Sequence, residues 1–167
     1  QYNQQHGVPL RSKMFGHFHT LAALARPVAG LANAISNLGP MKRALGIAEQ
    51  RNLPKFTAWT GLSVAKKEIK FFKPAAATKK VCLYIDEFTQ YNDAHIAQRA
   101  TELLCKLGYD VLPVYSPSGR AFLNKGMLEE ARRTAHQTLA RLAPAIAEGL
   151  PIVGLEPSGV LGFRDEY

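Results

Sequence analysis

Residues 81–93 read VCLYIDEFTQYND, five apolar residues that run directly into two acids. An apolar run of this length is typical of a strand in a parallel sheet that is buried on both faces. The pattern then repeats, with a helix expected over 93–107, a strand over 109–115, a helix over 128–147 and a strand over 152–155. This alternation predicts an α/β fold with an open parallel sheet, half of a Rossmann or flavodoxin-like domain, and the first strand is expected in its centre.

Three turns follow the three predicted strands, at 86–91, 116–120 and 156–164. Because parallel strands end at the same edge of a sheet, these turns are expected to converge where open α/β folds bind their ligands. The candidate binding or turn-bracing residues in the turns are Asp86, Glu87, Ser118, Gly119, Arg120, Glu156, Ser158 and Arg164.

Arg120 could have either of two roles at this edge. Its guanidinium, with nearby N–H groups, could bind a carboxylate or phosphate or brace a partner domain. Alternatively it pairs with Glu156 or Asp86 and ties the turns together. We expect the ion pair, and in particular a close approach of Arg120 and Glu156. Residues 164–166 (RDE) are expected to open a further helix, since acids stabilise a helix N-terminus.

The first part of the chain has a helical pattern. Apolar residues at three- and four-residue spacing predict helices over 12–37, broken at Pro27, and a third short helix over 41–50. These helices are expected outside the sheet. Residues 51–60 are irregular in pattern, and 64–80 is expected to be a Lys-rich connector.

Charge divides the chain in the same place. Residues 1–80 hold 13 Lys and Arg and 2 acids, a net charge of +11, whereas residues 81–167 hold 8 Lys and Arg and 11 acids, a net charge of −3. The difference predicts two segments with different roles. We expect a basic helical linker segment over 1–79 and an α/β domain over 80–167.

The basic segment has three classes of possible partner. Docking on partner domains of the same protein is preferred, and peripheral contact with an anionic membrane is second. Arg26, Pro27 and Asn33 interrupt its apolar stretches, so no membrane-spanning helix is expected. No nucleic-acid partner is expected, because an aromatic recognition motif is absent.

The chain offers few ligands for a metal or a nucleotide. Its two cysteines, Cys82 and Cys105, lie in apolar surroundings typical of buried thiols in a reduced cytoplasmic protein, and two thiols cannot form a four-thiolate site. His17 and His19 have no third ligand nearby, and neither a phosphate loop nor a dinucleotide fingerprint is present. The chain shows no secretory signal and no initiator methionine, so a segment of a longer cytoplasmic protein is expected.

Three stretches carry a family resemblance: DEFTQYND from Asp86, SGRAFLNKGMLEEAR from Ser118 and GLEPSGVLGFRDEY from Gly154. In this order they resemble the cysteine-rich "CCG" domain of FAD-linked D-2-hydroxyacid dehydrogenases, glycolate oxidase iron–sulfur subunits and heterodisulfide-reductase-like subunits. GVPLRSKMFGHF through NLPKFTAW is similar to the basic helical stretch between the ferredoxin-like module and the first CCG domain of the fused enzymes.

The resemblance implies where iron–sulfur ligands would fall. The cysteine of the first turn would fall near Glu87, the Cys-Cys-Gly of the second on residues 117–119, and the final Cys-x-x-Cys on Glu156 and Gly159. None of these positions is cysteine here. The resemblance therefore implies a degenerate, truncated CCG-type domain without a cluster of its own, with FAD and [4Fe-4S] clusters elsewhere in the parent chain.

These observations leave three functions open. By resemblance, the chain is part of an oxidoreductase that oxidises a D-2-hydroxyacid such as D-lactate, glycolate or 2-hydroxyglutarate. Its own part would then be docking of the FAD-binding and ferredoxin-like domains, cytoplasmic or membrane-associated, without catalysis. The alternatives are a non-redox scaffold module and a flavodoxin-like binder with a small-anion site at Arg120 and Glu156.

Overall fold

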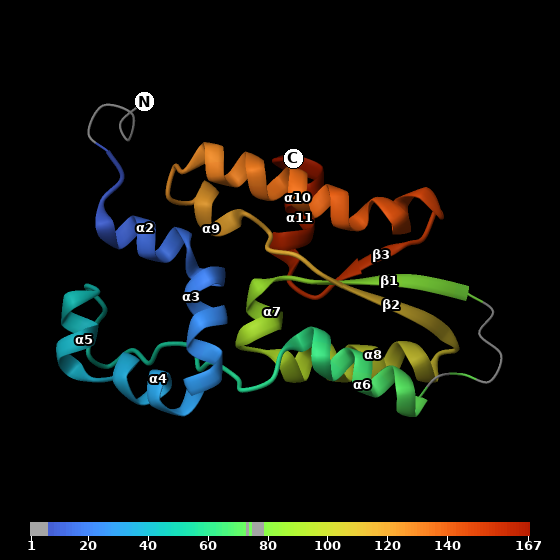
Figure 1. The fold of residues 1–167 in the computed structure, drawn as a ribbon, viewed down its shortest axis with the longest axis horizontal. Helices are drawn as coiled ribbons and strands as arrows, with labels where there is room; N and C mark the ends of the chain where they lie inside the picture. The colour runs from blue at the N-terminus through green and yellow to red at the C-terminus, as the bar shows by residue number, and fades with distance from the viewer. Residues whose placement is uncertain (1–6, 73, 75–78) are drawn as a thin grey trace.

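The computed structural model describes residues 7–72, 74 and 79–167. Figure 1 shows a parallel sheet between two helical layers, with the N-terminal helices gathered at one end. The sheet has the order β2-β1-β3. Its strands are β1 (Lys79–Ile85), β2 (Tyr109–Tyr115) and β3 (Ile152–Gly154). The predicted α/β class, the parallel pairing and the central position of the first strand are confirmed.

The sheet register explains an unusual residue in β2. β1 pairs with β2 along its whole length and places Leu83 opposite Pro113. Proline has no N–H to donate to a ladder and is tolerated where a strand has a free edge. β2 lies at the edge of the order β2-β1-β3, so Pro113 can occupy it.

Helices cover both faces of the sheet and follow the strands. The helices are α2 (Leu10–Gly16), α3 (Phe18–Ala25), η1 (Arg26–Val28), α4 (Ala29–Ser36), α5 (Gly39–Ala44), α6 (Gly61–Phe72), α7 (Glu87–Tyr91), α8 (Ala94–Lys106), α9 (Arg120–Leu123), α10 (Leu128–Ala147) and α11 (Pro157–Asp165). In Figure 1, α6 and α8 lie on one side of the strands and α10 and α11 on the other.

Alternate residues of β1 enter two separate cores. Val81, Leu83 and Ile85 pack with Ala97 of α8 and Ala65 of α6, as expected for side chains that point to one face of a strand. Cys82 and Tyr84 face the other way, into a second core that is formed with α10 and α11. Because both faces of β1 are covered, its sequence is continuously apolar rather than alternating.

The longest helix shows how the sequence selects its buried face. In α10, Ala131, Thr134, Thr138, Leu142 and Ala145 are buried, and their spacing of three and four residues puts them on one side of the helix. The bounds predicted for this helix, 128–147, match the structure.

The prediction of a Lys-rich connector over 64–80 is wrong for residues 64–72, which are helical, and for residues 79–80, which begin β1; residues 73 and 75–78 lie outside the described residues. Gly61–Phe72 is a helix, α6, that packs beside α8 on the sheet. Ala65 is fully buried, and Leu62 and Ile69 pack against the same core. The lysines belong to the polar face of an amphipathic helix. The sequence prediction was wrong because it relied on the number of lysines rather than on the spacing of the apolar residues. The proposed division of the chain at residue 79 stays a prediction, but α6 packs with the sheet.

Two further helix predictions need correction. The third helix was predicted over 41–50, but α5 ends at Ala44, where Gly46 adopts a left-handed conformation (φ +63°) and the N–H of Ile47 bonds back to the carbonyl of Lys42. This is a helix C-cap, which glycine favours. Residues 164–166 end α11 rather than opening a helix, because α11 already starts at Pro157.

The N-terminal helices pack against the carboxyl edge of the sheet. α2 contacts α9 and α3 contacts α7, the helices that directly follow β2 and β1 (Figure 1). Phe18 of α3 stacks on Phe88 of α7 with ring centroids 5.1 Å apart, and Ala22 is fully buried. The expected helical segment outside the sheet is confirmed, and it covers part of the edge where the candidate site lies.

Candidate functional site at the carboxyl edge of the sheet

The three predicted turns converge. A Cβ placed on Gly159 would lie 3.5 Å from the Cβ of Ser118, 3.8 Å from the Cβ of Asp86 and 3.9 Å from the Cγ of Glu156. One residue from each turn therefore meets at a single point. This convergence was expected because parallel strands end at the same edge of a sheet. It could be predicted without knowing any contact between the turns.

A buried carboxyl group joins the first turn to the second. Glu87 is 2% exposed, and its two oxygens accept hydrogen bonds from the backbone N–H of Ser118 at 2.7 Å and the hydroxyl of Ser118 at 2.9 Å. Burial raises the pKa of the Glu87 carboxyl, and the N–H of Ser118 opposes this increase. Two donors on one carboxyl fix the turn after β2 against the start of α7.

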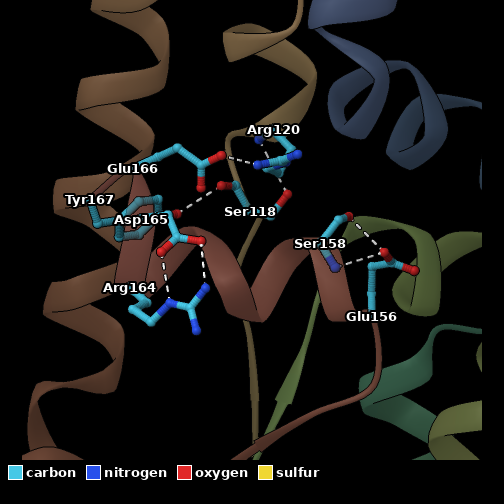
Figure 2. Close-up of polar contacts among 8 residues, drawn as sticks. All are labelled: Ser118, Arg120, Glu156, Ser158, Arg164, Asp165, Glu166 and Tyr167. Atoms are coloured by element: carbon cyan, nitrogen blue, oxygen red, sulfur yellow. Dashed lines mark hydrogen bonds and ion pairs between the residues drawn. The ribbon is translucent and has the colours of Figure 1, made fainter.

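Other groups satisfy the remaining polar atoms of the second turn. The hydroxyls of Ser116 and Thr138 bond at 2.8 Å, and Thr138 also donates to the carbonyl of residue 117 at 2.9 Å. The Tyr167 hydroxyl donates to the carbonyl of Ser118 at 2.8 Å (Figure 2). Burial raises the pKa of Tyr167 to about 12, so the hydroxyl stays a neutral donor. We call Glu87, Ser116, Ser118, Thr138 and Tyr167 the edge network.

Asp86 and Glu156 each begin a helix. Asp86 accepts from the N–H groups of Phe88 and Thr89 at 3.2 and 3.1 Å and caps α7, and Glu156 accepts from the N–H and hydroxyl of Ser158 at 3.1 and 2.6 Å and caps α11. Burial raises the pKa of Asp86, and the nearby Glu156 adds to the increase. The candidate residue Ser158 is thus part of a helix cap.

The expected Arg120–Glu156 pair is wrong. Arg120 instead forms an ion pair with Glu166, at the end of α11, while Glu156 is engaged at the start of the same helix (Figure 2). The cause is α11 itself, which separates the two acids along its length and brings the later one to Arg120. Arg164 also points away from the convergence point and pairs with its neighbour Asp165 at 2.7 Å.

Gly119 is required by the backbone of the second turn. Its φ of +72° lies in the left-handed region, where glycine carries no steric penalty, and it is the residue before α9. This conformation turns the chain so that the N–H of Ser118 faces Glu87 while Arg120 faces Glu166. The tight turn predicted at Ser118–Gly119 is confirmed.

A hollow of about 350 Å³ lies beside the edge network, between α9, α10 and the chain after α11. Its polar side chains are Arg132, His136, Glu166 and Tyr167, and the other lining residues are glycine, alanine and leucine. One guanidinium, of Arg132, and one carboxyl group, of Glu166, line this hollow, and Glu166 is already paired with Arg120. The predicted small-anion site at Arg120 and Glu156 is therefore not assembled, since one residue is ion-paired and the other caps a helix.

The thiols do not fit an iron–sulfur site. Cys82 lies in the core on the α10 side of the sheet and Cys105 in the core on the α8 side, so the two cannot ligate one cluster. Within the described ranges no three His, Cys, Asp or Glu residues are placed to share a metal ion. His17 and His19 instead pack edge-on against Phe122, with ring centroids 5.0 and 5.6 Å away.

Sequence reasoning missed part of the edge network. Thr138 stands among the regularly spaced buried residues of α10, and a hydroxyl at such a position indicates a buried partner. Ser116 directly follows the apolar strand β2 and had the same kind of signal. Tyr167 and Glu166 had no local signal, because they reach the site only through the path of α11.

The known proteins that this chain matches are D-2-hydroxyglutarate dehydrogenases. A D-2-hydroxyglutarate dehydrogenase of Pantoea ananatis is 34% identical over 107 residues, which cover 64% of this chain and 10% of that protein. The one of Escherichia coli is 39% identical over 90 residues, 53% of this chain and 9% of that protein. The one of Pseudomonas putida is 24% identical over 177 residues, 99% of this chain and 18% of that protein.

The chain is similar to part of these dehydrogenases. It spans about a tenth to a fifth of the length of the curated relatives it matches. No family model and no solved structure matches the chain. The resemblance to D-2-hydroxyacid dehydrogenases is supported by these relatives. Its finer part, the CCG domain, stays a prediction.

Proposed function

We propose that this chain is a segment of an FAD-linked oxidoreductase that oxidises a D-2-hydroxyacid, and that the segment docks other domains rather than carrying out the chemistry. The observation that carries the proposal is the similarity to D-2-hydroxyglutarate dehydrogenases, which in one relative extends over 99% of this chain. The name of those relatives makes D-2-hydroxyglutarate the first substrate to test.

The parent protein would hold its FAD and its [4Fe-4S] clusters outside this chain. The FAD would supply the two-electron oxidation of the carbon that bears the hydroxyl group, and the clusters would carry the electrons onward. The side chains at the edge of the sheet favour a structural role. Asp86, Glu87 and Glu156 are each occupied by N–H or hydroxyl donors of their own chain.

Residues 80–167 would form a degenerate CCG-type domain in which the edge network holds the turns together. In cysteine-bearing relatives of that type, thiolates from these turns hold a cluster. Here the carboxyl of Glu87 reaches Ser118 of the second turn, and the hydroxyl of Tyr167 reaches it from beyond the third. Hydrogen bonds would thus replace a cross-link through metal.

The proposal is tested on the longer polypeptide that contains this chain. Purified aerobically, it should contain FAD and should reduce an artificial electron acceptor when D-2-hydroxyglutarate is added. L-2-Hydroxyglutarate is the matched control, and D-lactate and glycolate define the substrate range. A protein without flavin, or one that oxidises none of D-2-hydroxyglutarate, D-lactate and glycolate, would refute the proposal.

A further inference from the structure

The N-terminal helices expose large apolar side chains. The exposed apolar residues of α3, η1, α4 and α5 and of the residue before α5 follow one another at spacings of three and four positions: Leu21, Leu24, Val28, Leu31, Ile35, Leu38 and Met41. Leu24 is 71% exposed and Leu31 is 62% exposed. Within α3 the pair Leu21 and Leu24, and within α4 the pair Leu31 and Ile35, lie on one side of their helix, a side that normally faces a core.

The buried side of the same helices is made of small or polar residues. Ala22 and Ala29 are the buried residues of α3 and α4. Asn33 holds α4 to the loop before α6, with its amide donating to the carbonyl of Phe56 at 2.9 Å and its oxygen accepting from the N–H of Phe56 at 2.8 Å. The lobe is attached through the buried Ala22, the ring stack of Phe18 on Phe88 and the hydrogen bonds of Asn33, whereas the leucines on its other side remain exposed.

Leu21, the first of these exposed residues, also lines an apolar hollow of about 140 Å³ in the same lobe. Its walls include Met14, Phe18, Leu21, Leu45, Leu53 and Phe56. An apolar cavity of about 150 Å³ can accept a benzene ring, so this hollow has room for one leucine or phenylalanine side chain. Its concave shape suits a protruding side chain better than the plane of a bilayer.

A second hollow beside it is basic. Arg11 and Arg51 line this hollow, which shares Phe15, Leu53 and Pro54 with the apolar one. Residues 7–60 contain seven basic residues and one acid, Glu49, a net charge of +6, and the basic residues are Arg11, Lys13, Arg26, Lys42, Arg43, Arg51 and Lys55. Glu49 pairs with Arg43, so it does not neutralise the two arginines of the basic hollow.

We propose that the lobe of α2–α5 is a docking surface for an acidic, apolar protein surface in another part of the same longer polypeptide. This proposal rests on the proposed function in one respect, that the chain is a segment of a longer protein. The small share of each relative that the chain covers supports this. The partner surface inserts one leucine or phenylalanine side chain into the apolar hollow. Asp or Glu side chains beside this anchor reach Arg11 and Arg51. Charge complementarity selects the partner, and the apolar anchor supplies most of the affinity.

The test places a photoreactive p-benzoylphenylalanine at position 21 of the longer polypeptide. Irradiation should cross-link it within the same molecule to a segment outside this chain in which acidic residues flank an apolar one. The control places the same residue at Leu103, which is 58% exposed and belongs to α8, outside the lobe. The expected yield at position 21 exceeds that at position 103 by at least about tenfold.

Charge variants test the basic hollow separately. R51E should lower the cross-link yield at position 21 at least about threefold. R132E, which makes the same charge change on α10, should leave the yield unchanged. Far-UV circular dichroism establishes that each variant is folded, and R51Q replaces R51E if the latter is not.

Four outcomes would overturn the proposal. These are equal yields at positions 21 and 103, no effect of the Arg51 variant, cross-links between isotopically distinct copies, and cross-links to lipid when anionic vesicles are present. The readout needs neither substrate nor flavin. Flavin reduction by D-2-hydroxyglutarate is measured on the same preparation, so failure of the docking surface and failure of the proposed activity are distinguished.

Discussion

Replacement of Glu87 by alanine should destabilise the fold by about 3 kcal/mol. The carboxyl accepts two hydrogen bonds from Ser118, at 2.7 and 2.9 Å, in a site where Glu87 is 2% exposed. A net contribution of about 1 kcal/mol per hydrogen bond, larger for charged partners, accounts for roughly two thirds of this value. The rest comes from the buried N–H of Ser118, which loses its acceptor.

A double-mutant cycle with S118A separates the side-chain bond from other effects. S118A removes the hydroxyl bond to Glu87 and the longer bond that the hydroxyl oxygen accepts from the N–H of Arg120 at 3.3 Å, and only the first involves Glu87. E87A should therefore cost about 1 kcal/mol less in the S118A background than in the wild type. Urea unfolding of the purified chain measures each free energy. E49A removes an exposed pair, with side chains 70% and 62% exposed, and should cost less than about 1 kcal/mol. An additive cycle, or an E87A effect as small as that of E49A, would refute the role of Glu87.

The same carboxyl should make the free energy of unfolding increase as the pH falls, the opposite of the usual effect of an acidic side chain. Burial raises the pKa of folded Glu87 above its ordinary value of 4.5, so the folded state binds more protons than the unfolded state between the two pKa values. This contribution to stability is complete below the unfolded pKa and is lost as the pH rises through the folded pKa. The free energy of unfolding of the wild type, relative to E87Q, should therefore increase as the pH falls from about 8 to about 5. A constant difference over this range would contradict the raised pKa.

Two further predictions concern metal and charge. In the longer polypeptide, the double variant C82A/C105A should leave the iron-to-flavin ratio unchanged, because the two thiols lie on opposite faces of the sheet; a loss of iron on substitution would show that they are ligands. In the chain itself, R120M should couple to E166Q by less than about 1 kcal/mol, since both side chains are about a third exposed, and should not couple to E156Q. A measured coupling to Glu156 alone would mean that α11 is placed differently.

The sheet could be predicted from sequence because its signals are local. Val81–Ile85 is continuously apolar, and the turns after β1 and β2 contain residues that favour helix starts or left-handed backbone. The error at α6 has a local cause as well. Lys66, Lys67 and Lys70 dominate the composition there, but Ala65 and Ile69 keep the four-residue spacing of a buried face.

The partners at the candidate site could be predicted only in part. The convergence of the turns follows from parallel topology, but the choice of Glu166 over Glu156 as the partner of Arg120 depends on the direction and length of α11. The start of α11 had a signal in the order Glu-Pro-Ser, an acceptor followed by proline in the first helical turn. Arg120 and Glu166 are 46 positions apart in the sequence, so no local pattern could identify the pair.

The two ends of the molecule differ in how Glu87 and Ser118, on one side, and the exposed leucines and arginines, on the other, are engaged, and this difference underlies the roles proposed for them. At the carboxyl edge Glu87 and Ser118 bond to each other, and Tyr167 closes the turn from outside. A ligand there would have to break these hydrogen bonds before it could form its own. The free energy lost in breaking them would offset the free energy gained on binding. In the α2–α5 lobe the reverse holds, because exposed leucines and arginines without an acidic neighbour gain by contact with a partner. Interaction with the rest of a longer protein is therefore expected at the lobe, and the sheet edge supports it through the contact of α3 with α7.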